Sequence, residues 1–349
     1  MTLRGSKSGA AAALIGVAAV WGATFVIVAD AIAVYPMYAF LGWRFALATV
    51  TFAIIFPRSI KRLDGANLRM GLFAGAFLTA GYIFQTWGLD GETATTPARA
   101  AFITGLYVVI VPLAQAVFLR RMPRPATLMG AGLALAGLWL LSGVDASGLG
   151  GWVFGDSMIV VCAVAYSAHM LVLGSTDERH DTGALTLVQL VTVTVVTASI
   201  SLLTEDAGLP TEPSVLFAIA VCGILASALA FAIQTWAQRR MPPARVALIL
   251  VTEPAFGGVI GWAAAGVWPL MEVAGASLML GGMITSEVVA AAAPESEMVE
   301  FEAGVQGMAA PVVEDEHRPS RLFDDSDDEP GSGQASAHQS AIDPKRGAL

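Results

Sequence analysis

The residues of this sequence that could do chemistry are a few ionisable side chains inside long apolar stretches. Glu253 is the one carboxylate that lies more than two helical turns within such a stretch, and Pro254 follows it. A carboxylate inside a bilayer must be paired or protonated. We therefore expect Glu253 to couple to protons, the alternative being a structural ion pair with an arginine of another helix. Asp156 is interpreted as a helix-start residue and His169 as either a satisfied interior histidine or a proton relay.

Three arginines are further candidates for binding or coupling. Arg99 and Arg245 begin two apolar segments at matching positions of an internal duplication, so each either anchors its helix at a membrane interface or contributes to a site. Arg44 lies in the segment Leu41-Gly42-Trp43-Arg44-Phe45. It is read either as a site residue or as a side chain that snorkels toward the outer headgroups.

Two prolines interrupt the same pair of segments. Neither Pro112 nor Pro254 can donate a hydrogen bond to the carbonyl one turn back, so each helix is expected to kink there. The freed carbonyls, at Val108 and Leu250, could line a cavity. Kinks in corresponding places of two repeats are typical of a transport site, whereas the alternative is a kink that only improves packing.

Matched amides and indoles open the duplicated stretch. Gln85 and Gln234 are candidates because an amide within a bilayer needs a partner, from a neighbouring helix or from a ligand. Trp87 and Trp236 are read either as binding residues or as interface anchors.

The duplication itself is read from three motifs that recur in one order. Gln-Thr-Trp, Pro-Ala-Arg and Gly-Ala-x-Leu-x-Leu-x-Gly occur in residues 85–137 and again in residues 234–282. The two arginines are 146 positions apart and the closing glycines 145 apart. A nearly constant offset between motifs in the same order indicates an internal repeat.

The composition is that of a membrane protein. Hydrophobic residues are 56% and charged residues 13% of the chain, against about 25% charged in soluble domains. A span needs about 20 mostly apolar residues, and ten segments qualify: 10–29, 37–56, 69–88, 98–118, 126–144, 155–174, 184–203, 214–236, 244–264 and 270–290. The sequence therefore predicts an all-α membrane protein of ten transmembrane helices.

The distribution of Lys and Arg predicts the orientation. If both termini are cytoplasmic, every Lys and Arg of the connections falls on the inner side, and the outer connections carry only acids. Five spans in each half then make the second copy enter the membrane upside down. The expected organisation is a first five-helix repeat over residues 1–147, a second, inverted one over 148–293, and a disordered acidic cytoplasmic tail over 294–349.

The whole net charge of −9 arises in residues 291–349, which hold 13 acidic and 4 basic residues. Cys162 and Cys222 are expected to be buried small hydrophobes. The sequence contains no Walker loop, no zinc-protease motif and no nucleophile elbow. We therefore expect no enzyme activity, no cofactor, no metal site and no nucleic-acid partner.

These motifs together resemble the EamA-type branch of the drug/metabolite transporter superfamily. The resemblance covers residues 10–290. It rests on Trp21-Gly22-Ala23-Thr24-Phe25, Arg44-Phe45, both Gln-Thr-Trp motifs, Glu253-Pro254 and the Gly275–Gly282 segment. It implies two inverted five-helix repeats around a central cavity and the export of amino acids or other small metabolites, often by proton exchange. Many members carry Gly-Glu at the end of the ninth helix, where this sequence has Gly266-Val267.

The sequence thus predicts a multi-pass secondary transporter of the cytoplasmic membrane that exports a small metabolite. Its expected partners are a small-molecule substrate, the lipid bilayer and protons, and no oligomeric state is assigned. The alternative is a non-transporting membrane component, such as a lipid translocator or an assembly scaffold.

Overall fold

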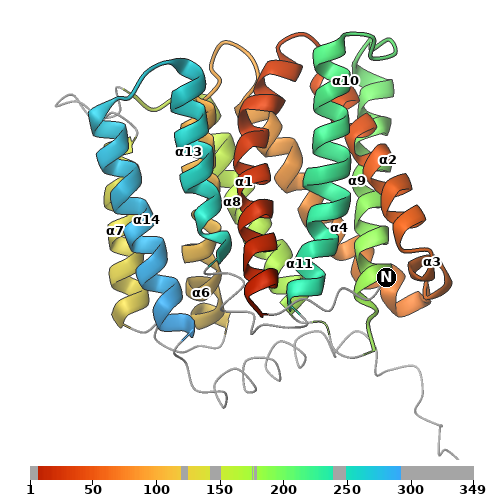
Figure 1. Ribbon diagram of the computed structural model, residues 1–349, viewed down its shortest axis with the longest axis horizontal. Coiled ribbons are helices and arrows are strands. Elements are labelled where there is room, and N and C mark those ends of the chain that lie inside the picture. Colours follow the sequence, from red (N-terminus) through yellow and green to blue (C-terminus); the bar gives the residue numbers. More distant parts are fainter. Residues whose placement is uncertain are drawn as a thin grey trace, which may run out of the picture. The chain divides into compact units, whose positions relative to one another are not determined.

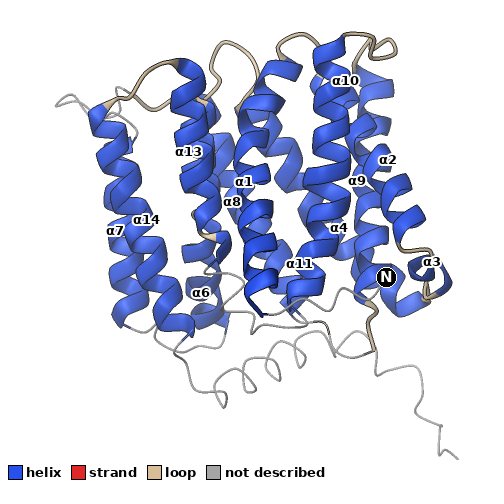
Figure 2. Ribbon diagram, in the orientation of Figure 1, coloured by secondary structure: helices blue, strands red, loops and turns tan. Residues whose placement is uncertain are grey.

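The structure, a computed structural model, describes residues 7–118, 125–141, 151–174, 176, 179–238 and 249–291. Every regular element within these ranges is helical, which confirms the all-α prediction for this part of the chain (Figure 2). The predicted tail, 294–349, lies outside the described residues, as do Arg245 and the loop 119–124.

The helices follow the two halves of the chain. The first half contains α1 (Lys7–Ile32), α2 (Met37–Ile55), α3 (Arg58–Lys61), α4 (Gly65–Gly88), α5 (Pro97–Thr104), α6 (Tyr107–Phe118) and α7 (Pro125–Leu141). The second half contains α8 (Phe154–Gly174), α9 (Thr182–Thr204), α10 (Pro213–Ala220), the π-helix η1 (Val221–Leu229), α11 (Ala230–Gln238), α13 (Thr252–Ala265) and α14 (Leu270–Ala291).

The helix ends carry local signals that the sequence can supply. Asp64, Thr96 and Asp181 are N-cap residues whose side chains accept a hydrogen bond from the third residue of α4, α5 and α9, respectively. Pro97 then occupies the first turn of α5, where its missing N–H is not needed. Gly266 ends α13 with a left-handed conformation, φ 67°, which glycine adopts without strain.

The lengths of the helices support a multi-pass membrane protein. Five helical stretches are long and apolar enough to cross a bilayer: Gly9–Ile32, Met37–Ile55, Phe154–Leu173, Thr182–Thr204 and Pro213–Gln234. Three shorter apolar helical stretches, Pro97–Val111, Leu128–Leu141 and Leu270–Thr285, lie at further predicted spans. The count of ten spans stays a prediction.

The last helices of the two halves, α7 and α14, pack side by side (Figure 1). A Cβ added to Gly137 would lie 2.5 Å from the carbonyl oxygen of Gly275, and one added to Gly282 would lie 2.5 Å from that of Gly130. The repeat motif aligns Gly130 with Gly275 and Gly137 with Gly282. The two contacts therefore exchange when the halves are exchanged, as a two-fold relation between the repeats requires.

Small residues bring other helices of the two halves together. An added Cβ would meet Val188 at Gly71 and Thr192 at Gly75, which shows that this face of α4 packs against α9. Such substitutions would force side chains apart, because helices approach this closely only over small residues. The spacing Gly71-x-x-x-Gly75 thus places two small residues on the face of α4 that approaches α9.

The helix breaks differ from the predicted kinks. α6 continues through Pro112, and the interruption falls earlier, at Gly105–Leu106 between α5 and α6. In the second half the turn is at Val251, and Pro254 lies in the first turn of α13, where a proline is tolerated. Gly105 and Val251 are each six positions after the arginine of a Pro-Ala-Arg motif. The breaks therefore correspond between the repeats, although the prolines do not mark them.

A second departure is the π-helix η1. The span predicted at 214–236 contains nine residues of π-helix between α10 and α11, whereas its counterpart α4 is α-helical over 24 residues. At Gly223 an added Cβ would lie 2.8 Å from the Arg44 carbonyl oxygen, so α2 approaches η1 closely. The indole N–H of Trp21 donates to the carbonyl oxygen of Ala226 at 2.7 Å. π-helical turns often occur at functional sites, which makes this region a place to look for one.

Candidate functional site

Arg44 is the central basic residue of the candidate site. Its residue is only 3% exposed, and its guanidinium carbon lies 4.7 Å from the ring centroid of Tyr82 and 5.1 Å from that of Phe45. Its Nε donates to the hydroxyl of Ser227 in η1 over 3.4 Å. Within the described part of the chain, Arg44 forms no ion pair with a carboxylate. The interpretation that Arg44 snorkels to the outer headgroups is therefore wrong, because aromatic rings and η1 enclose its head.

An aromatic array continues from Arg44 into the second half of the chain. The rings of Phe45 and Tyr82 are 4.6 Å apart, and those of Tyr82 and Tyr166 are 5.6 Å apart, both in edge-on geometry. Gly81 permits this approach, since an added Cβ would lie 2.2 Å from the Tyr166 ring. The array joins α2, α4 and α8, so it lies between helices of both repeats.

Glu253 is the candidate acidic residue and belongs to α13, in the second repeat. It lies in the first turn of that helix and is half-buried. A carboxylate at this end of a helix interacts favourably with the helix dipole. Arg44 of the first repeat contacts Tyr82, and Tyr82 contacts Tyr166 of the second repeat. These three residues, together with Glu253 of α13, are termed the central cluster.

The break at Gly105 lies against the first turn of α13, which follows the turn at Val251. A Cβ added to Gly105 would lie 2.5 Å from Cγ of Pro254, the residue after Glu253. Further along, Gly257 faces Ala101 and Gly261 faces Ala98, so α5 and α13 pack antiparallel over small residues. The spacing Gly257-x-x-x-Gly261 therefore serves close helix packing. Two interrupted helices that touch can change their relative angle with few broken hydrogen bonds.

Arg99 does not belong to the central cluster. Its Nη2 lies 2.6 Å from Oδ2 of Asp156, with side-chain exposures of 9% and 0%. Asp156 also accepts hydrogen bonds from the hydroxyl of Thr95 and from the backbone N–H of Val153, the latter at 3.0 Å. The guanidinium therefore has a structural partner, which disfavours the interpretation of Arg99 as a substrate ligand. Asp156 lies in the first turn of α8, as expected of a helix-start residue.

His169 is a satisfied interior histidine. Its Nε2 is 2.6 Å from Oε1 of Gln189, and both residues are buried. The Gln189 amide in turn donates to the carbonyl oxygen of Leu185 at 3.1 Å. This pair ties α8 to α9.

The matched amides and indoles are dispersed. Trp87 is 42% exposed and packs on the rings of Phe84 and Phe154, as an interface anchor does. Trp236 packs against the small cluster around Ala10 and Leu14. Gln85 in α4 and Gln234 in α11 are half-buried. Within the described ranges, no three His, Cys, Asp or Glu side chains come close enough to hold a metal ion.

Comparison with known proteins assigns the fold and the class of this chain. A model of the family described as "EamA-like transporter family" matches residues 8–143 and again 153–286. The chain belongs to the EamA-like transporter family. The two matches confirm the internal duplication, and the family makes this protein a membrane transporter.

Two similar proteins agree with this assignment. The chain is 27% identical over 240 residues to an "Uncharacterized transporter" of Archaeoglobus fulgidus, which covers 69% of this chain and 73% of that protein. A solved structure, described only as "Crystal structure of protein", superposes with a TM-score of 0.59 at 19% identity. It covers 81% of this chain and 98% of its own, and it shows the fold alone.

Sequence reasoning missed three residues of this EamA-like transporter's candidate site. Tyr82 and Tyr166 are uncharged residue types and belong to none of the repeated motifs. Ser227 is one of many hydroxyl residues in apolar helices. Glycines within apolar helices were the available signal. Gly81 contacts the Tyr166 ring, and Gly223 contacts the backbone of Arg44. Arg44 and Glu253 were found because ionisable residues in spans are rare.

Proposed function

We propose that this transporter is a secondary-active exporter of a small metabolite, such as an amino acid, and that it exchanges its substrate for protons. The observation that carries the proposal is the buried guanidinium of Arg44, which lies over the Tyr82 ring and forms no ion pair with a described carboxylate. Glu253, in the first turn of α13, supplies the acidic group from the other repeat. A buried guanidinium without a paired described carboxylate suits a substrate carboxylate. The carboxylate of Glu253 suits a substrate ammonium or a proton.

The proposed mechanism is alternating access in the cytoplasmic membrane, with both termini in the cytoplasm and the second repeat inverted. The proposed hinges are the interruption at Gly105, which contacts Pro254, and the turn at Val251, two residues before Glu253. Motion at these hinges changes which side of the membrane reaches Glu253. Its carboxylate then binds a proton on one side and releases it on the other.

Flux into proteoliposomes tests the proposal. With a pH gradient imposed, the full-length protein should accumulate a labelled amino acid from a mixture, whereas a non-transporting scaffold should accumulate none. The variant Glu253→Gln keeps the shape of the side chain but cannot ionise. It should still exchange substrate for substrate and lose accumulation driven by the pH gradient.

Glu92→Gln is the matched control, since Glu92 is an exposed glutamate in the loop after α4. It should accumulate substrate as the parent protein does. Unchanged pH-driven accumulation by Glu253→Gln would leave Glu253 as a structural residue. Transport that persists without any pH dependence in the parent protein would remove proton coupling from the proposal.

A further inference from the structure

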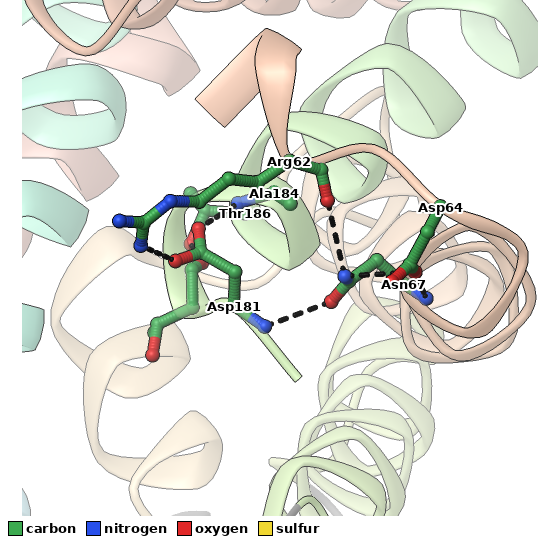
Figure 3. Close-up of polar contacts among 7 residues, drawn as sticks. Arg62, Asp64, Asn67, Asp181, Ala184 and Thr186 are labelled. Carbon is green, nitrogen blue, oxygen red and sulfur yellow. Dashed lines mark hydrogen bonds and ion pairs between the residues drawn. The ribbon is translucent and has the colours of Figure 1, made fainter. Parts of the chain in front are cut away.

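A polar network joins the two halves of the chain at the end of the helices where α4 and α9 begin (Figure 3). Nη1 of Arg62 lies 2.5 Å from Oδ2 of Asp181, the N-cap residue of α9. The backbone N–H of Asp181 donates to the Asn67 amide oxygen at 2.9 Å. The Asn67 amide nitrogen donates in turn to the carbonyl oxygen of Arg62 at 3.1 Å and to the carboxylate of Asp64 at 2.9 Å. Positions 62–67 and 181 are thus held as one unit.

This unit forms the wall of an open cavity of about 540 Å³. Both halves of the chain line it, with Lys61, Arg62, Leu63, Asp64 and Asn67 from the first and Arg179, His180 and Asp181 from the second. The cavity lies on the side that the distribution of Lys and Arg predicts to be cytoplasmic.

The two carboxylates of the cavity are already satisfied. Asp64 Oδ1 accepts from the backbone and side-chain nitrogens of Asn67 at 2.7 and 2.9 Å. Asp181 accepts from Arg62 and, through Oδ1, from the backbone N–H of Ala184 at 3.0 Å. The lining thus holds three basic side chains, Lys61, Arg62 and Arg179, beside two carboxylates, Asp64 and Asp181.

Exposed apolar residues adjoin these charges. Ile60 in the short helix α3 is 51% exposed, and Leu63, which lines the cavity, is 43% exposed. Large apolar side chains beside Lys and Arg at the end of transmembrane helices are typical of the membrane interface, where acyl chains meet phosphates. This part of the surface therefore suits a ligand that carries both a charged group and an apolar chain.

We propose that this cavity binds the phosphate headgroup of an anionic phospholipid. Lys61 and Arg179 supply the charge that attracts the phosphate, and Ile60 and Leu63 contact the upper part of the acyl chains. Basic pockets between transmembrane helices recognise anionic headgroups in this way. Because the lining comes from both halves of the chain, the bound lipid bridges them.

Binding can be measured on the full-length protein in a non-ionic detergent. Short-chain phosphatidylglycerol should raise the unfolding temperature in a saturable manner and should appear as a bound lipid in native mass spectra. Phosphatidylcholine with the same chains, and inorganic phosphate alone, should do neither. Raising the salt concentration should weaken the binding, because screening acts on exposed charges.

The variants Lys61→Gln and Arg179→Gln should each bind phosphatidylglycerol about five-fold more weakly, which corresponds to the loss of one basic residue near an anionic headgroup. Lys61→Arg should retain the binding. Arg69→Gln is the matched control, since Arg69 is exposed on α4 but does not line the cavity.

Three outcomes would overturn the assignment. Equal stabilisation by inorganic phosphate would replace the lipid by a soluble phosphate-bearing ligand. Equal stabilisation by phosphatidylcholine would remove recognition of the anionic headgroup. A loss in Arg69→Gln as large as that in Lys61→Gln would replace the cavity by diffuse surface charge. None of these measurements depends on substrate transport, so they are independent of the proposed function.

Discussion

Replacing Asp156 by asparagine should destabilise the protein strongly, because it leaves the Arg99 guanidinium buried without its counter-charge. The side chains of this pair are 9% and 0% exposed, so solvent screens their interaction little. Nε of Arg99 has no hydrogen-bond partner among the described residues, so the contact of Nη2 with Asp156 is its main compensation. Breaking a buried ion pair by removing one partner costs about 3–5 kcal/mol. We expect Asp156→Asn to lie toward the upper part of that range.

The assay is unfolding by denaturant of the full-length protein in detergent micelles, followed by tryptophan fluorescence. Asp90→Asn is the control, because it makes the same chemical change at a half-buried loop position and should change the free energy of unfolding by less than about 0.5 kcal/mol. The double variant Arg99→Met/Asp156→Leu removes both charges and should recover most of the lost stability. Equal, small losses in Asp156→Asn and Asp90→Asn would refute the reasoning. A double variant that is as unstable as Asp156→Asn would show that packing or hydrogen bonding, and not the unpaired charge, is responsible.

Two further outcomes are expected. Gly105→Ala should destabilise the protein by about 1–3 kcal/mol and reduce flux, since its Cβ would lie 2.5 Å from Pro254. The control Gly132→Ala has nothing within 4 Å of its Cβ and should be neutral or slightly stabilising. Equal effects in the two variants would contradict a close contact at the hinge. Burial alone would raise the pKa of Asp181, but the hydrogen bond and charge of Arg62 and the backbone N–H of Ala184 lower it overall. The contribution of Asp181 to stability should therefore be fully present above its unfolded pKa of about 3.9 and be lost as the pH falls below that value. Unfolding temperatures measured from pH 3 to 8 should show this loss, and Arg62→Gln should reduce it; an equal acid-induced loss in Arg62→Gln would exclude the pair as its origin.

Much of the architecture follows from the sequence because the rules that a bilayer imposes apply to each chain segment by itself. Every backbone polar group in hydrocarbon must be satisfied within its own segment, so long apolar runs become helices. The duplication was likewise readable from motif spacing, and the family match over residues 8–143 and 153–286 confirms it. The spacing Gly71-x-x-x-Gly75 is typical of close helix packing, whereas the structure supplies the partner helix, α9.

The directions of the polar side chains could not be read in the same way. Each residue turns the helix by 100°, and a helix that is apolar on all sides carries no stripe to indicate which face is inward. The sequence could therefore not decide whether Arg44 reaches the headgroups or the interior. Nor could it assign Asp156 as the partner of Arg99, since 57 positions of chain separate them.

The positions of the helix breaks were also decided by tertiary packing. Proline marks a missing hydrogen bond, and sequence reasoning placed the kinks at Pro112 and Pro254 for that reason. The breaks instead fall at Gly105 and Val251. At Gly105 the absence of a side chain lets two interrupted helices touch. Apolar composition and local caps thus indicated which segments are helical and where several of them end, whereas contacts between the two repeats decided which charges meet, as at Arg99 and Asp156.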